Sequence, residues 1–181
     1  YIYKNKPLFK HSLEKAIKSK LFKKIILVTD RKKVKEKLQK NVLIIKGGKE
    51  RFNSSLIALK YIKKFKPNNV LIHDAARPNF SFKLLSKIIK NLKNNKAVIP
   101  VTNSTDSIKY KTMNQLYNLK RENSFLTQTP QGFKFNDLYN LSIKQKNNVT
   151  DESSLFIQNN FRIKLIKGEY LNKKVTYKED I

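Results

Sequence analysis

Short apolar runs and longer amphipathic stretches alternate along the first half of the chain. The β-branched apolar runs predict buried strands that end at polar turn residues. These predicted strands are Lys24–Thr29, Asn41–Lys46, Asn69–His73 and Ala97–Val101. The amphipathic stretches predict helices. The first starts at Pro7, and the others cover residues 31–40, Arg51–Phe65 and Phe82–Leu92. Because such alternation is typical of a mostly parallel sheet with helices on both faces, the pattern predicts an α/β fold.

The second half of the chain begins with a break in this pattern. Residues 102–128 are polar and rich in asparagine, which favours an extended arm that could pair with another subunit. Helical patterns return at Phe135–Ile143 and Asp151–Gln158, and Arg162–Ile166 predicts a last strand. We see no repeat or linker, so we expect a single domain over residues 1–181.

Composition narrows the class of protein. The chain has no cysteine and two histidines, which excludes disulfides and makes a thiolate or histidine-rich metal site impossible to build. No apolar run approaches the roughly 20 residues that cross a bilayer, so we expect a cytoplasmic protein without a membrane partner. The net charge of +27 favours anionic partners. The lysines are spread along the chain and form no stripe, which argues against nucleic acid.

Ligands of open α/β sheets bind beyond the carboxyl ends of the strands, and unusual residues cluster there. Gly47 and Gly48 follow the second predicted strand and would let the backbone approach a base or a phosphate before a helix begins. An ordinary glycine turn, with Asn53 or Ser54 capping that helix, is the alternative. The five arginines stand out against the lysine background as candidates for bidentate contacts with phosphate or carboxylate groups. They are Arg31, Arg51, Arg77, Arg121 and Arg162.

The third predicted strand ends in a second candidate segment. Asp74 at the strand end is well placed to hold a divalent metal or a substrate hydroxyl. Arg77 could neutralise a phosphate or form a purely structural pair with Asp74, and both alternatives stay open. For His73 we favour a hydrogen-bonded core position over a catalytic one.

The remaining polar segments are ambiguous by themselves. Ser107, Arg121 and Thr129 read as turn residues, and Thr150 has the character of a helix N-cap. Lys174 is, on composition, one more lysine. No Gly-x-Ser-x-Gly elbow or Gly-x-x-x-x-Gly-Lys-Ser/Thr loop occurs, and two distant histidines make a Ser-His-Asp triad improbable.

Several motifs taken in order carry a resemblance to a known family. GGKERFNSS, IHDAARP, DSIK, TQTPQGF, VTDESS and NKKVTYKED follow one another along the chain. In this order the sequence resembles the 4-diphosphocytidyl-2-C-methyl-D-erythritol synthases. The resemblance implies a Rossmann-like, GT-A-like nucleotidyltransferase fold with a protruding β-arm, a homodimer joined through that arm, and dependence on Mg²⁺. It also implies attack of methylerythritol phosphate on the α-phosphorus of CTP with release of pyrophosphate.

The resemblance also assigns roles to individual residues. Cytosine would be held by Gly47, Gly48 and Ser54. The acceptor substrate would be bound by Asp74, Arg77, Ser107, Thr129 and Thr150, with Asp74 as a possible metal ligand. Lys174 would stabilise charge on the phosphates, and Arg121 would grip the substrate phosphate from the neighbouring subunit. Ser107 stands where the family has threonine, which keeps the hydroxyl.

The N-terminus of the sequence departs from the family pattern. Family members begin with a strand and a Gly-rich loop that clamps the triphosphate, ahead of the position of Tyr1. We therefore expect an N-terminally truncated sequence, in which a chain starting at Tyr1 has a gap in its sheet and almost no activity. Ribitol-5-phosphate cytidylyltransferase is the nearest alternative, which Ala76 disfavours. A noncatalytic basic module that binds RNA or a protein partner is the other.

Overall fold

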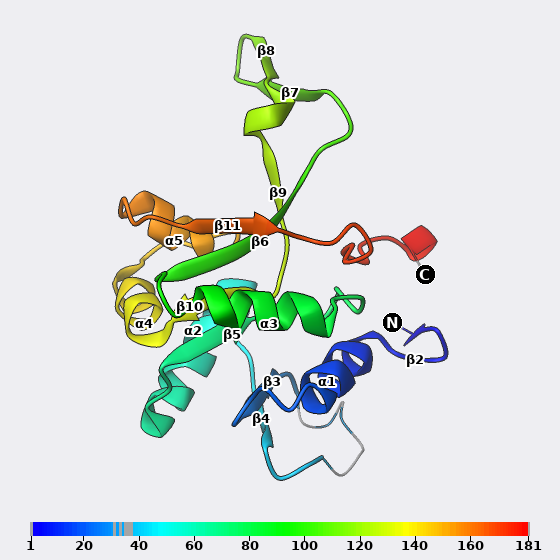
Figure 1. Cartoon of the computed structure of the whole chain (residues 1–181), viewed down its shortest axis with the longest axis vertical. Helices are drawn as coiled ribbons and strands as arrows, with labels where there is room; N and C mark the ends of the chain where they lie inside the picture. Colours follow the sequence, from blue (N-terminus) through cyan, green and yellow to red (C-terminus); the bar gives the residue numbers. More distant parts are fainter. Residues whose placement is uncertain (1, 31, 33, 35–37, 181) are drawn as a thin grey trace.

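The computed structural model describes residues 2–30, 32, 34 and 38–180. A central mixed sheet has the strand order β11-β6-β10-β5 (Figure 1). The strands in this order are β5 (Asn69–Ile72), β6 (Ala97–Asn103), β10 (Gln131–Lys134) and β11 (Lys164–Lys167), and a fifth strand, β9 (Phe125–Thr127), pairs with the end of β6. β11 is parallel to β6, and β10 is antiparallel to both β5 and β6. β5, β6 and β11 therefore run in one direction, and the predicted α/β class is confirmed.

Further strands flank this sheet. β3 (Ile25–Val28) and β4 (Val42–Ile45) form a separate parallel pair, in the positions that the sequence predicted. β1 (Ile2–Tyr3) and β2 (Lys6–Pro7) form a short antiparallel pair at the N-terminus. Of the charged helix expected over residues 31–40, residues 31, 33 and 35–37 lie outside the described residues, and residues 38–40 are not helical.

Five α-helices occur in the described part of the chain. They are α1 (Leu8–Lys18), α2 (Arg51–Ile62), α3 (Phe82–Asn91), α4 (Phe135–Lys144) and α5 (Ser153–Gln158). A 3₁₀ turn, η2 (Lys63–Phe65), continues α2, and another, η4 (Lys178–Asp180), lies near the C-terminus. The predicted helices at Arg51–Phe65, Phe82–Leu92 and Phe135–Ile143 agree closely with α2 and η2, α3 and α4, because their apolar residues recur at helical spacing and form one face that packs on the sheet.

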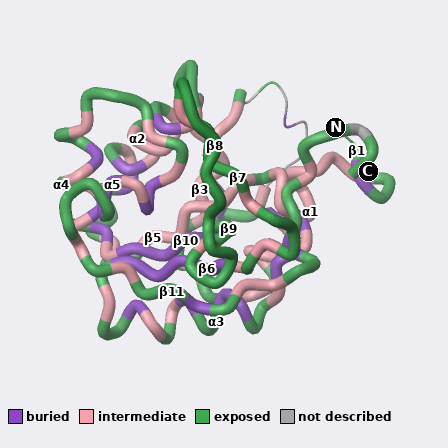
Figure 2. Tube along the Cα trace, turned by 90° about the horizontal axis from the view of Figure 1, so that it is seen from above, coloured by how far each residue is buried: buried purple, intermediate pink, exposed green. Residues whose placement is uncertain are grey.

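The alternation of side chains along β6 explains the two layers of core. Val98 packs with α3 in one cluster, whose buried members include Leu84, Ile88 and Leu92. Ala97 and its same-face neighbours pack into a second cluster with α2, α4 and α5. Successive side chains of a strand point to opposite faces, so one apolar strand fills both cores. The buried segments at the centre of Figure 2 include β6 and β10.

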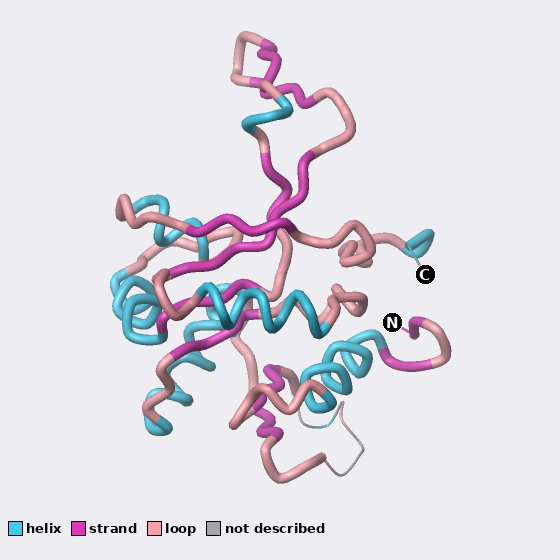
Figure 3. The backbone as a smooth tube through the Cα atoms, viewed as in Figure 1, coloured by secondary structure: helices cyan, strands magenta, loops and turns pink. Residues whose placement is uncertain are grey.

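The arm expected over residues 102–128 stands away from the domain (Figure 3). Its elements are β7 (Ile108–Lys111), β8 (Leu116–Leu119), the 3₁₀ turn η3 (Arg121–Asn123) and β9 (Phe125–Thr127). β7 and β8 form an antiparallel hairpin, and β9 returns along the end of β6. Several large apolar side chains of the arm are exposed, and Met113 at the tip is 97% exposed. The arm is therefore an apolar surface that its own domain does not cover.

Candidate functional site

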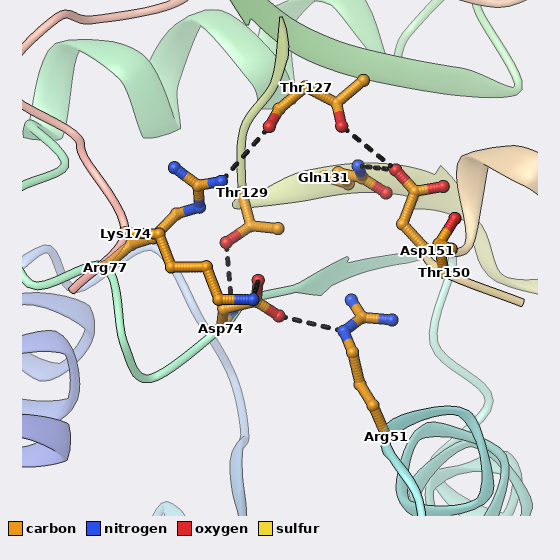
Figure 4. Close-up of a pocket in the computed structure, with 9 residues that line it drawn as sticks. All are labelled: Arg51, Asp74, Arg77, Thr127, Thr129, Gln131, Thr150, Asp151 and Lys174. Carbon is orange, nitrogen blue, oxygen red and sulfur yellow. Dashed lines mark hydrogen bonds and ion pairs between the residues drawn. The ribbon is translucent and has the colours of Figure 1, made fainter. Parts of the chain in front are cut away.

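A pocket of about 160 Å³ opens beyond the carboxyl end of β5 (Figure 4). It is lined by Arg51, Asp74, Arg77, Thr127, Thr129, Gln131, Thr150, Asp151 and Lys174. Side chains from the loop after β5, the start of α2, the end of β9, β10, the segment before α5 and the C-terminal segment meet there. The structure thus brings together five of the residues predicted from the sequence: Asp74, Arg77, Thr129, Thr150 and Lys174.

Asp74 lies at the centre of the charged groups in this pocket. Arg51 Nε donates to Asp74 Oδ1 at 3.0 Å, and Lys174 Nζ lies 3.6 Å from Asp74 Oδ2. Burial raises the pKa of Asp74, but the cations Arg51 and Lys174 outweigh burial and hold that pKa below its ordinary value. Asp74 is therefore ionised at neutral pH. The structural pair with Arg77, which the sequence left open, is wrong, because Asp74 pairs with other cations.

Arg77 uses its guanidinium to join backbone segments at the pocket wall. Nη1 donates to the carbonyl oxygen of Asn172 at 2.9 Å, and Nη2 donates to that of Thr127 at 3.2 Å. Burial lowers the pKa of Arg77 from its ordinary value. These two carbonyl bonds fix the plane of the guanidinium without neutralising it, so its positive charge stays at the pocket.

His73 lies beneath Asp74 in a closed set of hydrogen bonds. Its Nε2 lies 3.1 Å from the carbonyl oxygen of Arg77, and its Nδ1 lies 3.0 Å from Thr129 Oγ1. The Asp74 backbone N–H donates to the same hydroxyl at 3.0 Å. Ser12 Oγ lies 3.2 Å from His73 Nε2. A neutral imidazole with its proton on Nε2, which accepts from the Thr129 hydroxyl at Nδ1, fits these contacts. Burial lowers the pKa of His73 to about 4. The core position that the sequence favoured fits these contacts.

The start of α5 differs from the prediction. Thr150 is not the N-cap, because the helix begins at Ser153. Asp151 Oδ1 instead accepts hydrogen bonds from the Ser153 hydroxyl and the Ser154 backbone N–H. Gln131 Nε2 donates to Asp151 Oδ2 at 2.8 Å. Burial raises the pKa of Asp151, but these hydrogen bonds outweigh it and leave the pKa below its ordinary value. Thr150, freed from capping, lines the pocket.

The glycine segment lies outside this pocket, before α2. The Gly48 backbone N–H donates to Ser54 Oγ at 3.1 Å. A Cβ at Gly47 would lie 2.7 Å from Ser54 Oγ, and one at Gly48 would lie 2.5 Å from Asn53 Cβ. Both positions therefore require glycine for close packing. The alternative in which Asn53 or Ser54 caps the helix is wrong, because α2 already begins at Arg51.

Arg121 and Ser107 belong to the arm and do not line the pocket of their own chain. Both are exposed, and Arg121 Nη1 donates to the carbonyl oxygen of Thr105 at 3.0 Å. Their distance from the other predicted residues is a property of the protruding arm, which carries them away from the domain.

Sequence reasoning gave no role to an ion pair behind the pocket. Arg51 forms a bidentate pair with Glu152, with contacts of 3.0 and 2.8 Å, and the Glu152 side chain is fully buried. Arg51 was among the arginines that stood out against the lysine background. Nothing in the sequence pointed to its partner.

The described residues do not offer a protein site for a divalent metal. No group of three or more His, Asp or Glu side chains within residues 2–30, 32, 34 and 38–180 could hold one. Asp74 is shared between two cations, and both oxygens of Asp151 already accept hydrogen bonds. Among the described residues Asp74 therefore belongs to no preformed site with three or more protein ligands, and its role as a metal ligand stays a prediction. No helix in the described part of the chain is both long and apolar enough to cross a membrane.

Known proteins resemble this chain over its whole length. The family model for IspD, 2-C-methyl-D-erythritol 4-phosphate cytidylyltransferase, matches residues 1–181. The bifunctional enzyme IspD/IspF of Pelagibacter ubique (strain HTCC1062) is 47% identical over 99% of this chain and 49% of its own length. The 2-C-methyl-D-erythritol 4-phosphate cytidylyltransferase of Thermosipho melanesiensis is 33% identical over 99% of this chain and 84% of its own length. The chain thus spans about half the length of the bifunctional relative and most of the monofunctional one.

Solved structures agree with these sequence relatives. The 4-diphosphocytidyl-2C-methyl-D-erythritol synthase of Anaerococcus prevotii superimposes with a TM-score of 0.90 at 30% identity, over 99% of this chain and 87% of that one. The Francisella tularensis 2-C-methyl-D-erythritol 4-phosphate cytidylyltransferase gives a TM-score of 0.87 at 28% identity, over 98% and 86%. The resemblance and the nucleotidyltransferase fold predicted from the sequence are confirmed, and the ribitol phosphate and noncatalytic alternatives are not favoured. This chain belongs to the 2-C-methyl-D-erythritol 4-phosphate cytidylyltransferase (IspD) family of nucleotidyltransferases.

Proposed function

We propose that the protein transfers the cytidylyl group of CTP to 2-C-methyl-D-erythritol 4-phosphate. A phosphate oxygen of the acceptor forms a bond to the α-phosphorus of CTP, the bond from that phosphorus to the bridging oxygen breaks, and pyrophosphate leaves. The products are 4-diphosphocytidyl-2-C-methyl-D-erythritol and pyrophosphate. The observation that carries this proposal is the pocket of Asp74, Arg77, Thr129, Thr150 and Lys174, in a chain that the family model matches from end to end.

The positive charges of the pocket suit the phosphate of the acceptor. Arg77 and Lys174 present positive charge on one side of the pocket in Figure 4. Phosphoryl transfer brings several negative charges together, so cations held in place lower the repulsion and stabilise the transition state. The Lys174 side chain is 48% exposed, and its Nζ lies 3.6 Å from Asp74 Oδ2. This is a long contact for an ion pair, and a phosphate can replace it. We assign the phosphate of the acceptor to Arg77 and Lys174.

The hydroxyl groups of the acceptor are assigned to the other polar side chains. Asp74 is ionised and can accept a hydrogen bond from a hydroxyl of the polyol. Thr129 already accepts from the Asp74 backbone and contacts His73, so its part is to hold the loop in place. Thr150 is exposed at the pocket edge and free to contact the substrate.

The cytosine of CTP is assigned to the glycine segment, Gly47 and Gly48. Backbone groups of Gly47 and Gly48 would contact the base, and Ser54 orders that backbone by accepting a hydrogen bond from the Gly48 N–H. Backbone groups can distinguish the amino donor of cytosine from the carbonyl acceptor of uracil. The Mg²⁺ requirement stays a prediction, and phosphate oxygens of CTP would have to supply most of the ligands because no group of three or more carboxylate or imidazole side chains occurs among the described residues.

We also propose a cytoplasmic homodimer in which the arm carries Arg121 and Ser107 to the pocket of the partner. Two features support this proposal. Arg121 lies outside the pocket of its own chain, and the arm exposes apolar side chains such as Leu116 and Tyr117. Apolar surface of this kind is typical of a subunit interface.

Pyrophosphate release tests the proposed function. Protein expressed from its full reading frame is given CTP and Mg²⁺, with methylerythritol phosphate and ribitol phosphate offered separately. We expect release with methylerythritol phosphate and much less with ribitol phosphate, and UTP in place of CTP controls for the nucleotide. Release with ribitol phosphate alone, or with neither acceptor, would contradict the proposal.

A further inference from the structure

Arg51 has a place in the pocket that neither the motifs nor the proposed roles explain. It is the first residue of α2, and its guanidinium reaches two carboxylates at once. Nη1 and Nη2 donate to the two oxygens of Glu152, and Nε donates to Asp74 Oδ1 at 3.0 Å. Figure 4 shows the side chain approaching Asp74 from α2. All three nitrogen atoms of the guanidinium are therefore committed to carboxylates.

Glu152 is the anchor of this arrangement. Its side chain is completely buried, and burial of a carboxylate without a partner is strongly unfavourable. A bidentate pair fixes the plane of a guanidinium as well as its position. Because Nη1 and Nη2 are held by Glu152, the remaining donor edge is directed towards Asp74.

The contact with Lys174 is different in kind. Lys174 Nζ lies 3.6 Å from Asp74 Oδ2, and its side chain is 48% exposed, against 31% for Arg51. A single ion-pair contact at that distance, with one partner half exposed, is weaker than the hydrogen-bonded contacts of Arg51. When a phosphate enters the pocket it can attract Lys174 away from Asp74, whereas Arg51 is held in place by Glu152.

We propose that Arg51 is a positioning residue, which holds Asp74 in one rotamer and in its ionised state while Lys174 is released to the acceptor phosphate. This inference rests on the proposed function and deepens it. Oδ1 of Asp74 is occupied by Arg51, so the acceptor hydroxyl binds at Oδ2, the oxygen that Lys174 vacates. Arg51 thereby determines which oxygen of Asp74 accepts the hydrogen bond from the polyol.

Other groups around Asp74 have to be considered in any test that uses pH. The charged and titratable side chains that face it or its partners are Arg51, Arg77, Lys174, His73, Asp151 and Glu152. A ratio of variant to wild-type rates at each pH removes the titration of the substrate phosphate, which is common to both proteins.

The test compares Arg51→Gln with Arg51→Lys and with Lys60→Gln, which removes one positive charge from an exposed position on the same helix. For Arg51→Gln we expect kcat/KM for methylerythritol phosphate to fall about 30-fold, as for loss of a charge-assisted hydrogen bond. The Kd of CTP should stay within about twofold of wild type, because Arg51 does not contact the glycine segment. The deficit in kcat/KM should grow about twofold more between pH 8 and pH 5, because Asp74 without Arg51 is easier to protonate. Lys60→Gln should match the wild type.

Arg51→Lys separates charge from geometry and covers the case in which Arg51→Gln does not fold. Lysine keeps a positive charge beside Asp74 but cannot form the bidentate pair with Glu152. We expect a raised KM for methylerythritol phosphate with no additional loss at pH 5. Equal loss of affinity for both substrates in step with a lower Tm would indicate a merely structural role and overturn the proposal. A kcat/KM of Arg51→Gln for methylerythritol phosphate within threefold of wild type would also overturn it. Failure of the wild-type protein to release pyrophosphate would instead refute the proposed function.

Discussion

The protonation of His73 gives a prediction that can be worked out from the structure. The imidazole is enclosed by Phe80, whose ring centroid lies 4.6 Å away, and by its contacts with Arg77 and Thr129. Burial lowers its pKa from 6.5 to about 4. Between these two values the unfolded chain binds a proton that the folded protein does not. Stability is therefore fully present above pH 6.5 and is lost as the pH falls towards 4.

The size of this loss follows from the two pKa values. Integrating the proton linkage from pH 8 to pH 5 gives a loss of about 2 kcal/mol of unfolding free energy from His73 alone. Replacement by glutamine, His73→Gln, removes the titration while keeping a side-chain amide that can donate to the Arg77 carbonyl. The variant is less stable than wild type at pH 8, and we expect the difference to shrink by about 2 kcal/mol at pH 5.

Urea denaturation followed by circular dichroism at pH 8, 7, 6 and 5, at constant ionic strength, measures this difference. Ser12→Ala is the matched control, because it removes the hydroxyl 3.2 Å from Nε2 and leaves the imidazole in place. That variant should follow the pH dependence of the wild type. A stability difference between wild type and His73→Gln that is the same at pH 8 and pH 5 would show that His73 does not change its protonation on unfolding in this range.

Two further predictions concern the core and the arm. In Gly132→Ala the added Cβ would lie 2.4 Å from Ile88 Cγ2 and 2.9 Å from Leu92 Cδ1, so we expect a loss of about 1–3 kcal/mol by overpacking, seen as a lower urea midpoint. An unchanged midpoint would show that α3 moves freely away from β10. Asp74→Ala and Arg121→Ala should each lower kcat/KM about 100-fold while CTP still binds. If one site uses Asp74 and Arg121 of different subunits, mixing the two variants should restore about a quarter of wild-type activity. Mixed protein that stays inactive although its subunits exchange would place both residues in one chain's site.

Most elements of the fold could be predicted because their signals are local. The predicted helix Phe82–Leu92 is observed as Phe82–Asn91, and the predicted strand Asn69–His73 as Asn69–Ile72. Hydrophobic periodicity needs only neighbouring residues, so one sequence was enough. β10 was missed because Gln131–Lys134 is short and has no apolar run. Its strand character comes from hydrogen bonds to β5 on one side and β6 on the other.

Local patterns and ordered motifs in the sequence are enough to predict the α/β class, the family and a cluster of polar residues at strand ends. Which of these charges pair depends on how distant segments pack together. Arg51 and Glu152 are 101 residues apart and Arg51 and Asp74 are 23 apart, yet one guanidinium holds both carboxylates. The same packing excluded the nearer pair of Asp74 with Arg77. Ion pairs form between groups that the fold brings within a few ångströms and removes from water, and neither distance in space nor burial is written in the spacing of residues along the chain.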